Sequence, residues 1–165
     1  MIGVLLIASR QPDEFVVART ATLAAPPATV FAHVDDLHLW QAWSPWARMD
    51  PNAKSTFDGP PAGTGAVFSW EGNSKVGKGR MTIVESRPHE LIRFRLDFEK
   101  PFKNTCTAEF TFRPEDAMTT VTWTMCGKAN LMSKIMGLLM NCDKMVGSQF
   151  EQGFANLKGV LAASV

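Results

Sequence analysis

Apolar residues alternate with polar ones near the start of the chain, and their period then lengthens. Residues 15–25 are rich in Val and Thr and end at Pro26 and Pro27, which predicts a first strand. The next apolar residues recur at helical spacing: Val30, Phe31, Val34 and Leu37. Because a proline in the first helical turn removes no intrahelical hydrogen bond, we expect a short helix directly after the two prolines.

Three tryptophans, Trp40, Trp43 and Trp46, follow at three-residue intervals. Pro45 should end any helix near residue 44, so this stretch predicts a second short helix and then a turn. The indoles can pack in the core, form a lid over the mouth of a cavity, or meet a membrane interface or a partner, since Trp is amphipathic. Core packing is the first interpretation, and the other two stay open.

From residue 47 to Gly127 short alternating runs are separated by Gly, Pro, Asn and Asp, which predicts an antiparallel meander of about six strands. The helical period returns from Asn130 to the C-terminus. One apolar stripe there consists of Met145, Val146, Phe150, Phe154, Leu157 and Leu161. A long amphipathic helix therefore closes the chain.

The register of three hairpins can be predicted by keeping apolar residues on one face. We expect four-residue loops at 114–117 and 86–89 and a turn at Asn73 and Ser74. The resulting opposed pairs are Phe110 with Val121, Ala108 with Trp123, Cys106 with Met125, Met81 with Phe94, Ile83 with Ile92, Phe68 with Gly79 and Trp70 with Gly77. Glycine opposite a large ring indicates the close approach of a bulky group or a ligand.

These registers also assign the outward residues. Glu109 should face outward opposite Arg95 and form a cross-strand ion pair with it. Cys106 and Cys126 should face opposite sides, which disfavours a disulfide between them.

A sheet with one apolar face must be covered, and the C-terminal helix carries the matching stripe. The inward residues alternate large rings with small residues, so we expect a cavity between sheet and helix. The expected ligand-binding residues are Trp40, Trp43, Phe68, Trp70, Met81, Phe94, Phe110, Trp123, Met136 and Phe150. Met132, Met136 and Met140, at four-residue spacing, fit a core stripe or an adaptable ligand lining.

Four stretches resemble the helix-grip superfamily, and within it the polyketide cyclase/dehydrase and lipid transport branch. They are 24–31 (AAPPATVF), 40–46 (WQAWSPW), 77–81 (GKGRM) and 145–158 (MVGSQFEQGFANLK). The resemblance runs from about Phe15 to Leu161. It implies an α+β fold with a curved antiparallel sheet of about seven strands around the long C-terminal helix, with two short helices after the first strand. It also implies a cavity for a small hydrophobic ligand.

Three functions are compatible with that fold. A binding or carrier domain for a lipid-like or aromatic polyketide-like ligand is the leading hypothesis, because apolar burial alone would hold such a molecule. A polyketide cyclase/dehydrase is the first alternative and would need an acid or base inside the cavity. An interaction module resembling activators of heat-shock ATPases is the second.

Few residues have the chemistry that the enzyme requires. His38 with Asp35 and Asp36 forms a His/carboxylate cluster, which a solvated helix terminus explains equally well. Glu71 and Glu109 should both face outward. We therefore expect no catalytic residue and no metal or other cofactor, although a slip of one residue would turn Glu71 inward.

Composition indicates which classes of partner and which cellular compartment to expect. Of 165 residues, 17 are Lys or Arg and 16 are Asp or Glu, so there is no basic footprint for nucleic acid. Three cysteines without CxxC spacing suggest neither a disulfide framework nor a zinc site, which favours the cytoplasm.

An apolar run over residues 2–8 precedes the first strand. It is too short to span a bilayer and lacks the basic start of a signal peptide. A disordered or docked terminus, the stub of a membrane anchor and an edge strand all remain open, so membrane contact through this segment is an alternative. We assign residues 1–14 to this segment and 15–165 to a single ligand-binding domain of unknown oligomeric state.

Overall fold

The computed structural model describes residues 14–45, 50, 52–73, 77–100, 103–128 and 142–163. In chain order its elements are β1 (Glu14–Leu23), α2 (Pro27–Asp35), the 3-10 helix η1 (Leu39–Ala42), β2 (Lys54–Asp58), β3 (Val67–Glu71), β4 (Lys78–Arg87), β5 (Leu91–Lys100), β6 (Asn104–Glu115), β7 (Met118–Lys128) and α4 (Cys142–Ala163).

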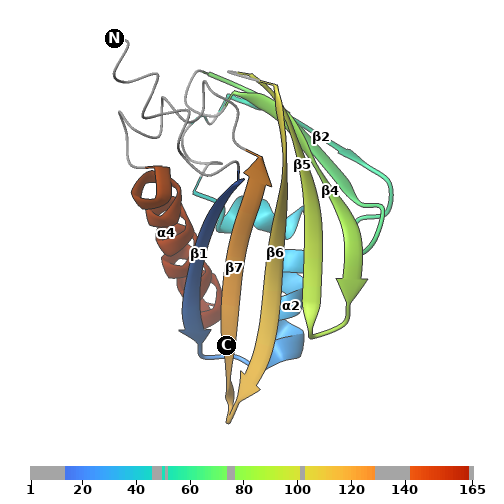
Figure 1. The fold of residues 1–165 in the computed structure, drawn as a ribbon. Helices are drawn as coiled ribbons and strands as arrows, with labels where there is room; N and C mark the ends of the chain where they lie inside the picture. Colours follow the sequence, from blue (N-terminus) through green and yellow to red (C-terminus); the bar gives the residue numbers. More distant parts are fainter. Residues whose placement is uncertain are drawn as a thin grey trace, which may run out of the picture.

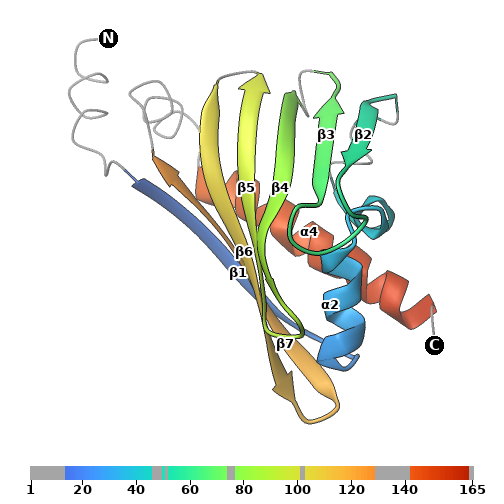
Figure 2. The same cartoon turned by 90° about the vertical axis from the view of Figure 1, so that its right-hand side faces the viewer.

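The seven strands form one antiparallel sheet in the order β1-β7-β6-β5-β4-β3-β2. Strands β2 to β7 are the six-stranded meander expected from the sequence, and β1 joins at the β7 edge. The sheet is curved, and α4 runs obliquely across its concave side while α2 covers that side farther along (Figures 1 and 2). The predicted α+β architecture is confirmed, with the second short helix present as one 3-10 turn.

Helix α2 forms for the reason read from the sequence. Pro26 is extended, with φ −69° and ψ 157°, and Pro27 takes the first helical position, where its missing N–H is no loss. Val30, Phe31 and Val34 are buried on the face toward the sheet. The helix therefore covers part of the concave side through the residues that set its period.

The faces of the strands are as predicted, but the register of each of the three hairpins differs by two residues. Phe110 lies opposite Trp123, not Val121. The reason is a two-residue turn at 116–117, tighter than the expected loop, with Asp116 in the left-handed region at φ 55°. A shift of two preserves the side of every residue, so the buried set is unchanged.

The other two hairpins show the same shift. Their observed pairs are Ile83 with Phe94, Met81 with Leu96, Phe68 with Met81 and Trp70 with Gly79. In the β4–β5 hairpin the turn lies at 88–90, and a β-bulge between Ile83 and Glu85 leaves one residue of β4 without an opposed partner. Gly79 is thus opposite Trp70, and the expected pairing of Gly79 with Phe68 is wrong.

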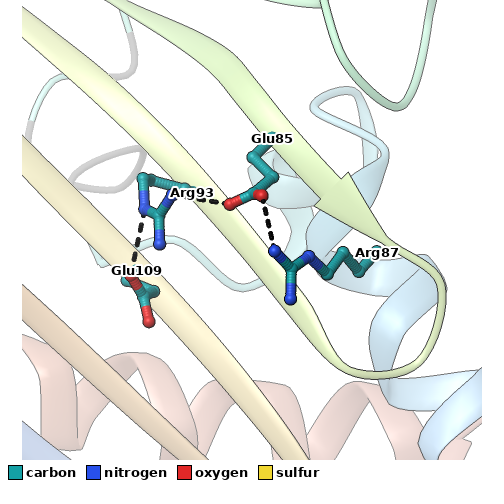
Figure 3. Close-up of polar contacts among 4 residues, drawn as sticks. All are labelled: Glu85, Arg87, Arg93 and Glu109. Carbon is teal, nitrogen blue, oxygen red and sulfur yellow. Dashed lines mark hydrogen bonds and ion pairs between the residues drawn. The ribbon is translucent and has the colours of Figure 1, made fainter.

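The convex face carries a chain of alternating charges, shown in Figure 3. Arg93 contacts Glu85 at 2.5 Å and Glu109 at 3.1 Å, and Glu85 also contacts Arg87 at 3.1 Å. The predicted partner of Glu109 is Arg95, but the register of β5 against β6 places Arg93 opposite it instead.

Cys106 and Cys126 face opposite sides of the sheet, as predicted, because Cys106 lies in the inner row and Cys126 lies opposite Thr107 in the outer row. No helix in the described ranges is long and apolar enough to cross a bilayer.

Candidate ligand-binding site

One end of the concave side is filled by aromatic rings, called here the aromatic cluster. Its members are Trp40, Trp43, Phe94, Phe110, Trp123 and Phe150, each at most 5% exposed. Trp123 of β7 stacks on Phe150 of α4 with ring centroids 4.0 Å apart, and on Phe110 at 4.7 Å. These contacts join sheet and helix directly, so the rings here are core.

Trp40 and Trp43 can be buried in the aromatic cluster because both indole N–H groups have backbone partners. Trp40 Nε1 donates to the Val34 carbonyl at 2.6 Å, and Trp43 Nε1 donates to the His33 carbonyl at 3.0 Å. Asn156 of α4 in turn donates to the Trp43 carbonyl at 3.0 Å. Of the three interpretations of these tryptophans, the described geometry favours core packing for Trp40 and Trp43.

A second set of rings is only half-buried and is called here the aromatic row. It comprises Phe57, Phe68, Trp70 and Phe98, on the inner side of β2, β3 and β5. Consecutive centroids are 5.2, 6.0 and 5.9 Å apart. The row packs against the core on one side and retains accessible apolar surface, as a site for an apolar molecule requires.

Gly79 explains how Trp70 is held in the aromatic row. A Cβ on Gly79 would lie 2.7 Å from Trp70 Cζ2 and 2.9 Å from the Asp97 carbonyl oxygen. The indole therefore lies directly on the backbone of β4. The space expected at this glycine is occupied by the cross-strand ring itself.

One inward charged residue, Arg19, was not among the predicted site residues. Arg19 lies on the α4 side of β1, between Val17 and Ala21, and contacts Glu151 of α4 at 3.3 Å. Its guanidinium occupies the position that a side chain on Gly147 would take. The alternation of β1 was the available signal, because Arg19 shares the parity of the buried Val17 and Leu23.

Two of the cavities formed by described residues adjoin β2. One of about 280 Å³ is lined mainly by charged and hydroxyl side chains of β2 to β5, such as Lys54, Arg80 and Glu99. The other, of about 230 Å³, lies where the end of α2 meets the loop after β2 and includes His38 and Phe57.

The expected ligand-binding residues thus divide by position. Trp40, Trp43, Phe94, Phe110, Trp123 and Phe150 form the aromatic cluster, Phe68 and Trp70 belong to the aromatic row, and Met81 is buried between the two groups. Met136, like Trp46, Met132 and Met140, lies outside the described residues. Contact of any of them with a ligand stays a prediction.

The sequence profile of the family described as polyketide cyclase/dehydrase and lipid transport matches residues 14–162, almost the whole chain. The chain belongs to this family. Among curated proteins there is no match.

Solved structures similar to this member of the polyketide cyclase/dehydrase and lipid transport family share its fold. Protein MLL2253 from Mesorhizobium loti has a TM-score of 0.68 at 16% identity, covering 92% of this chain and 99% of its own. Ara h 8.0201 has a TM-score of 0.62 at 13% identity, over 91% and 99%. The Aha1 dimer from Colwellia psychrerythraea has 0.62 at 11%, over 87% and 93%. At these identities the likeness shows the helix-grip fold alone.

In this family member, few polar side chains on the inner side of the sheet could contact a ligand. Along the inner rows of the described strands, no side chain is a carboxylate or an imidazole. Glu71 is exposed, and Glu109 lies on the convex face with Arg93. Among the described residues, no group of three His, Cys, Asp or Glu residues could hold a metal ion.

The three histidines lie near the end of α2 and in the β4–β5 turn. His33 Nδ1 is 2.9 Å from the Thr29 carbonyl, and His89 packs edge-on against Phe31. His38 is 3.2 Å from Asp36 and stacks on Phe57 at 4.0 Å. Of the three, His38 therefore adjoins the aromatic row.

Proposed function

We propose that the protein binds or carries a small hydrophobic molecule, lipid-like or aromatic, on the aromatic row. The observation that carries this proposal is the contrast between the two ends of the concave side. The aromatic cluster is saturated with ring contacts, whereas the four rings of the aromatic row are half-buried and adjoin one another. A ligand lying on them would remove apolar surface from water at about 25 cal/mol per Å².

In this function, shape and the burial of apolar surface hold the ligand, and the protein catalyses no reaction on it. The inner rows of the described strands supply mainly rings, aliphatic side chains and small residues, and Arg19 on them contacts Glu151. A cyclase would need a general acid or base within hydrogen-bond reach of the ligand. We therefore propose a carrier domain over residues 15–165, with a small hydrophobic molecule as its partner and without nucleic acid.

Binding of the neutral fluorescent probe N-phenyl-1-naphthylamine tests this function. If the probe covers about 50 Å² of the Phe68 ring, Phe68→Ala should weaken binding by about 1.2 kcal/mol, roughly eightfold. Val84→Ala is the matched control, because Val84 is 46% exposed on β4 away from the aromatic row. Equal affinities of the two variants, or no binding by the wild-type protein, would contradict the proposal.

Native mass spectrometry of the purified protein gives an independent answer. The proposal predicts a copurified small apolar molecule, or uptake of one when the protein is mixed with a lipid extract. Turnover of a polyketide-like substrate by the folded protein would instead support the cyclase/dehydrase alternative.

A further inference from the structure

The cavity beside His38 has the components of a small binding site of its own. It is called here the His38 pocket, and its volume is about 230 Å³. Its apolar wall is formed by Leu37, Phe57, Pro60, Pro61 and Val67. Ligand sites for drug-sized molecules begin at about 300 Å³, so this pocket accommodates a molecule of about one ring.

His38 is held in the wall of this pocket by two contacts. Its ring stacks on Phe57 with centroids 4.0 Å apart and an interplanar angle of 16°. Asp36 Oδ1 accepts a hydrogen bond from the His38 backbone N–H at 2.9 Å and lies 3.2 Å from Nδ1. The imidazole is therefore fixed in position and in plane although its side chain is 50% exposed.

The carboxylate also determines the tautomer of His38. An ionised carboxylate can only accept hydrogen bonds, so Nδ1 must carry the proton that faces Asp36. Nε2 of the neutral ring is then a hydrogen-bond acceptor. His38, which lines the pocket, thus supplies one hydrogen-bond acceptor beside the apolar wall.

The backbone around the His38 pocket is pinned on both sides. Asp36 forms a β-bridge with Ala62, which ties the end of α2 to the loop after β2. That loop is tied to β4 by two hydrogen bonds, Gly65 N–H to the Ile83 carbonyl at 2.8 Å and Ile83 N–H to the Ala66 carbonyl at 3.0 Å. A site whose walls are already fixed loses little conformational entropy when it binds a ligand.

The charges around the pocket select the class of ligand. Asp58 lines the pocket and Asp36 lies behind His38, while no Lys or Arg is among the described residues that line it. An anion would meet two carboxylates without a cation to balance it. A neutral molecule with a flat apolar body and one O–H donor matches both the wall and the acceptor.

We propose that the His38 pocket binds a small neutral hydroxyl-bearing aromatic molecule of the phenol class, whose hydroxyl donates to His38 Nε2. The ring of this molecule lies against the apolar wall formed by Phe57 and the two prolines. The site goes beyond the carrier function proposed above, because it has its own polar anchor and would hold its ligand when the aromatic row is empty.

Phenol and anisole, which share the ring but differ in the O–H donor, test this site. In the full-length ¹⁵N-labelled protein, phenol should shift the His38 Nε2 resonance saturably and leave those of His33 and His89 unchanged. Phenol should bind about fivefold more tightly than anisole, the factor expected of one neutral hydrogen bond. Equal affinities, equal shifts at the three histidines, or no saturable shift would overturn the proposal.

Replacing His38 separates the hydrogen bond from the packing. His38→Phe keeps a ring on Phe57 and removes Nε2, so the preference for phenol over anisole, measured by calorimetry, should fall to about one. A preference that survives in a folded His38→Phe variant would overturn the proposal. Phe68→Ala should weaken binding of N-phenyl-1-naphthylamine but leave the preference for phenol over anisole unchanged, because Phe68 is not among the described residues that line the His38 pocket. Failure of the His38 pocket and failure of the carrier function therefore give different results.

Discussion

Three glycines of α4 allow the packing between helix and sheet to be measured with one substitution. Gly147, Gly153 and Gly159 all lie inside the helix. Replacing a glycine within a helix by alanine gains about 1 kcal/mol of intrinsic helix propensity at each site. The differences among the three variants therefore report what each new methyl group meets.

Gly159→Ala should stabilise the protein by about 1 kcal/mol, because a Cβ there has no heavy atom within 4 Å. A Cβ on Gly153 would lie 3.1 Å from Trp123 Cζ3 and 3.5 Å from both Pro45 and Trp43. Trp123 cannot retreat easily, since it is stacked between Phe110 and Phe150.

Forcing a methyl group into such packing costs about 1–3 kcal/mol, which exceeds the propensity gain. Gly153→Ala should therefore destabilise the protein by about 1 kcal/mol, a difference of about 2 kcal/mol from Gly159→Ala. Gly147→Ala displaces the flexible Arg19 side chain from Glu151, which is 65% exposed, so its two effects should nearly cancel.

Urea denaturation followed by circular dichroism measures the free energy of unfolding of each variant. Equal stabilisation by Gly153→Ala and Gly159→Ala would refute the account, because it would mean that α4 does not press on Trp123.

Three further predictions concern charge and protonation. In the free energy of unfolding, a double-mutant cycle of Glu109→Gln with Arg93→Gln should give a coupling of about 0.5 kcal/mol that weakens in 1 M salt. The cycle of Glu109→Gln with Arg95→Gln should be additive, since Arg95 pairs with Asp97. The reverse result would support the pairing of Glu109 with Arg95 predicted from the sequence. Burial raises the pKa of Asp35 above its usual 3.8, so this carboxyl contributes stability at low pH that is lost as the pH rises through the raised pKa. The stability of Asp35→Asn relative to wild type, from urea titrations at several pH values, should therefore increase with pH, and a decrease would contradict the sign. Burial raises the pKa of Cys106 from 9.0 to about 11, which leaves about a hundredfold less thiolate at pH 8. Iodoacetamide labelling of Cys106 at pH 8, followed by peptide mapping, should therefore be about a hundredfold slower in the folded protein than in urea. Equal rates would exclude burial of this thiol.

The sequence predicts correctly which face of a strand each residue lies on, because alternate residues of a strand point to opposite faces. Strand faces follow from a period of two, so Phe110 and Trp123 are buried even though their partners were displaced by two residues. The two-residue shift between β6 and β7 comes from the tight turn at Asp116, whose left-handed backbone cannot be predicted from the alternation of hydrophobic residues. The partner of Glu109 depends on a separate register, that of β5 against β6, which places Arg93 and not Arg95 opposite it.

The candidate site was less predictable, because side-chain volume does not say which neighbour fills a space. Gly79 was correctly read as a point of close approach, but the approaching group is the Trp70 ring. Trp40 and Trp43 are core because their N–H groups reach the backbone of α2, a contact between segments that spacing alone does not specify.

Fluorine NMR of the protein labelled with 5-fluorotryptophan tests the central claim, that an apolar ligand binds to the aromatic row and not to the aromatic cluster. Trp70 lies in the row, whereas Trp40, Trp43 and Trp123 lie in the cluster. Saturation with N-phenyl-1-naphthylamine should shift the Trp70 resonance and leave the resonances of Trp40, Trp43 and Trp123 within their linewidths. A shift of the cluster resonances with Trp70 unchanged would contradict the account.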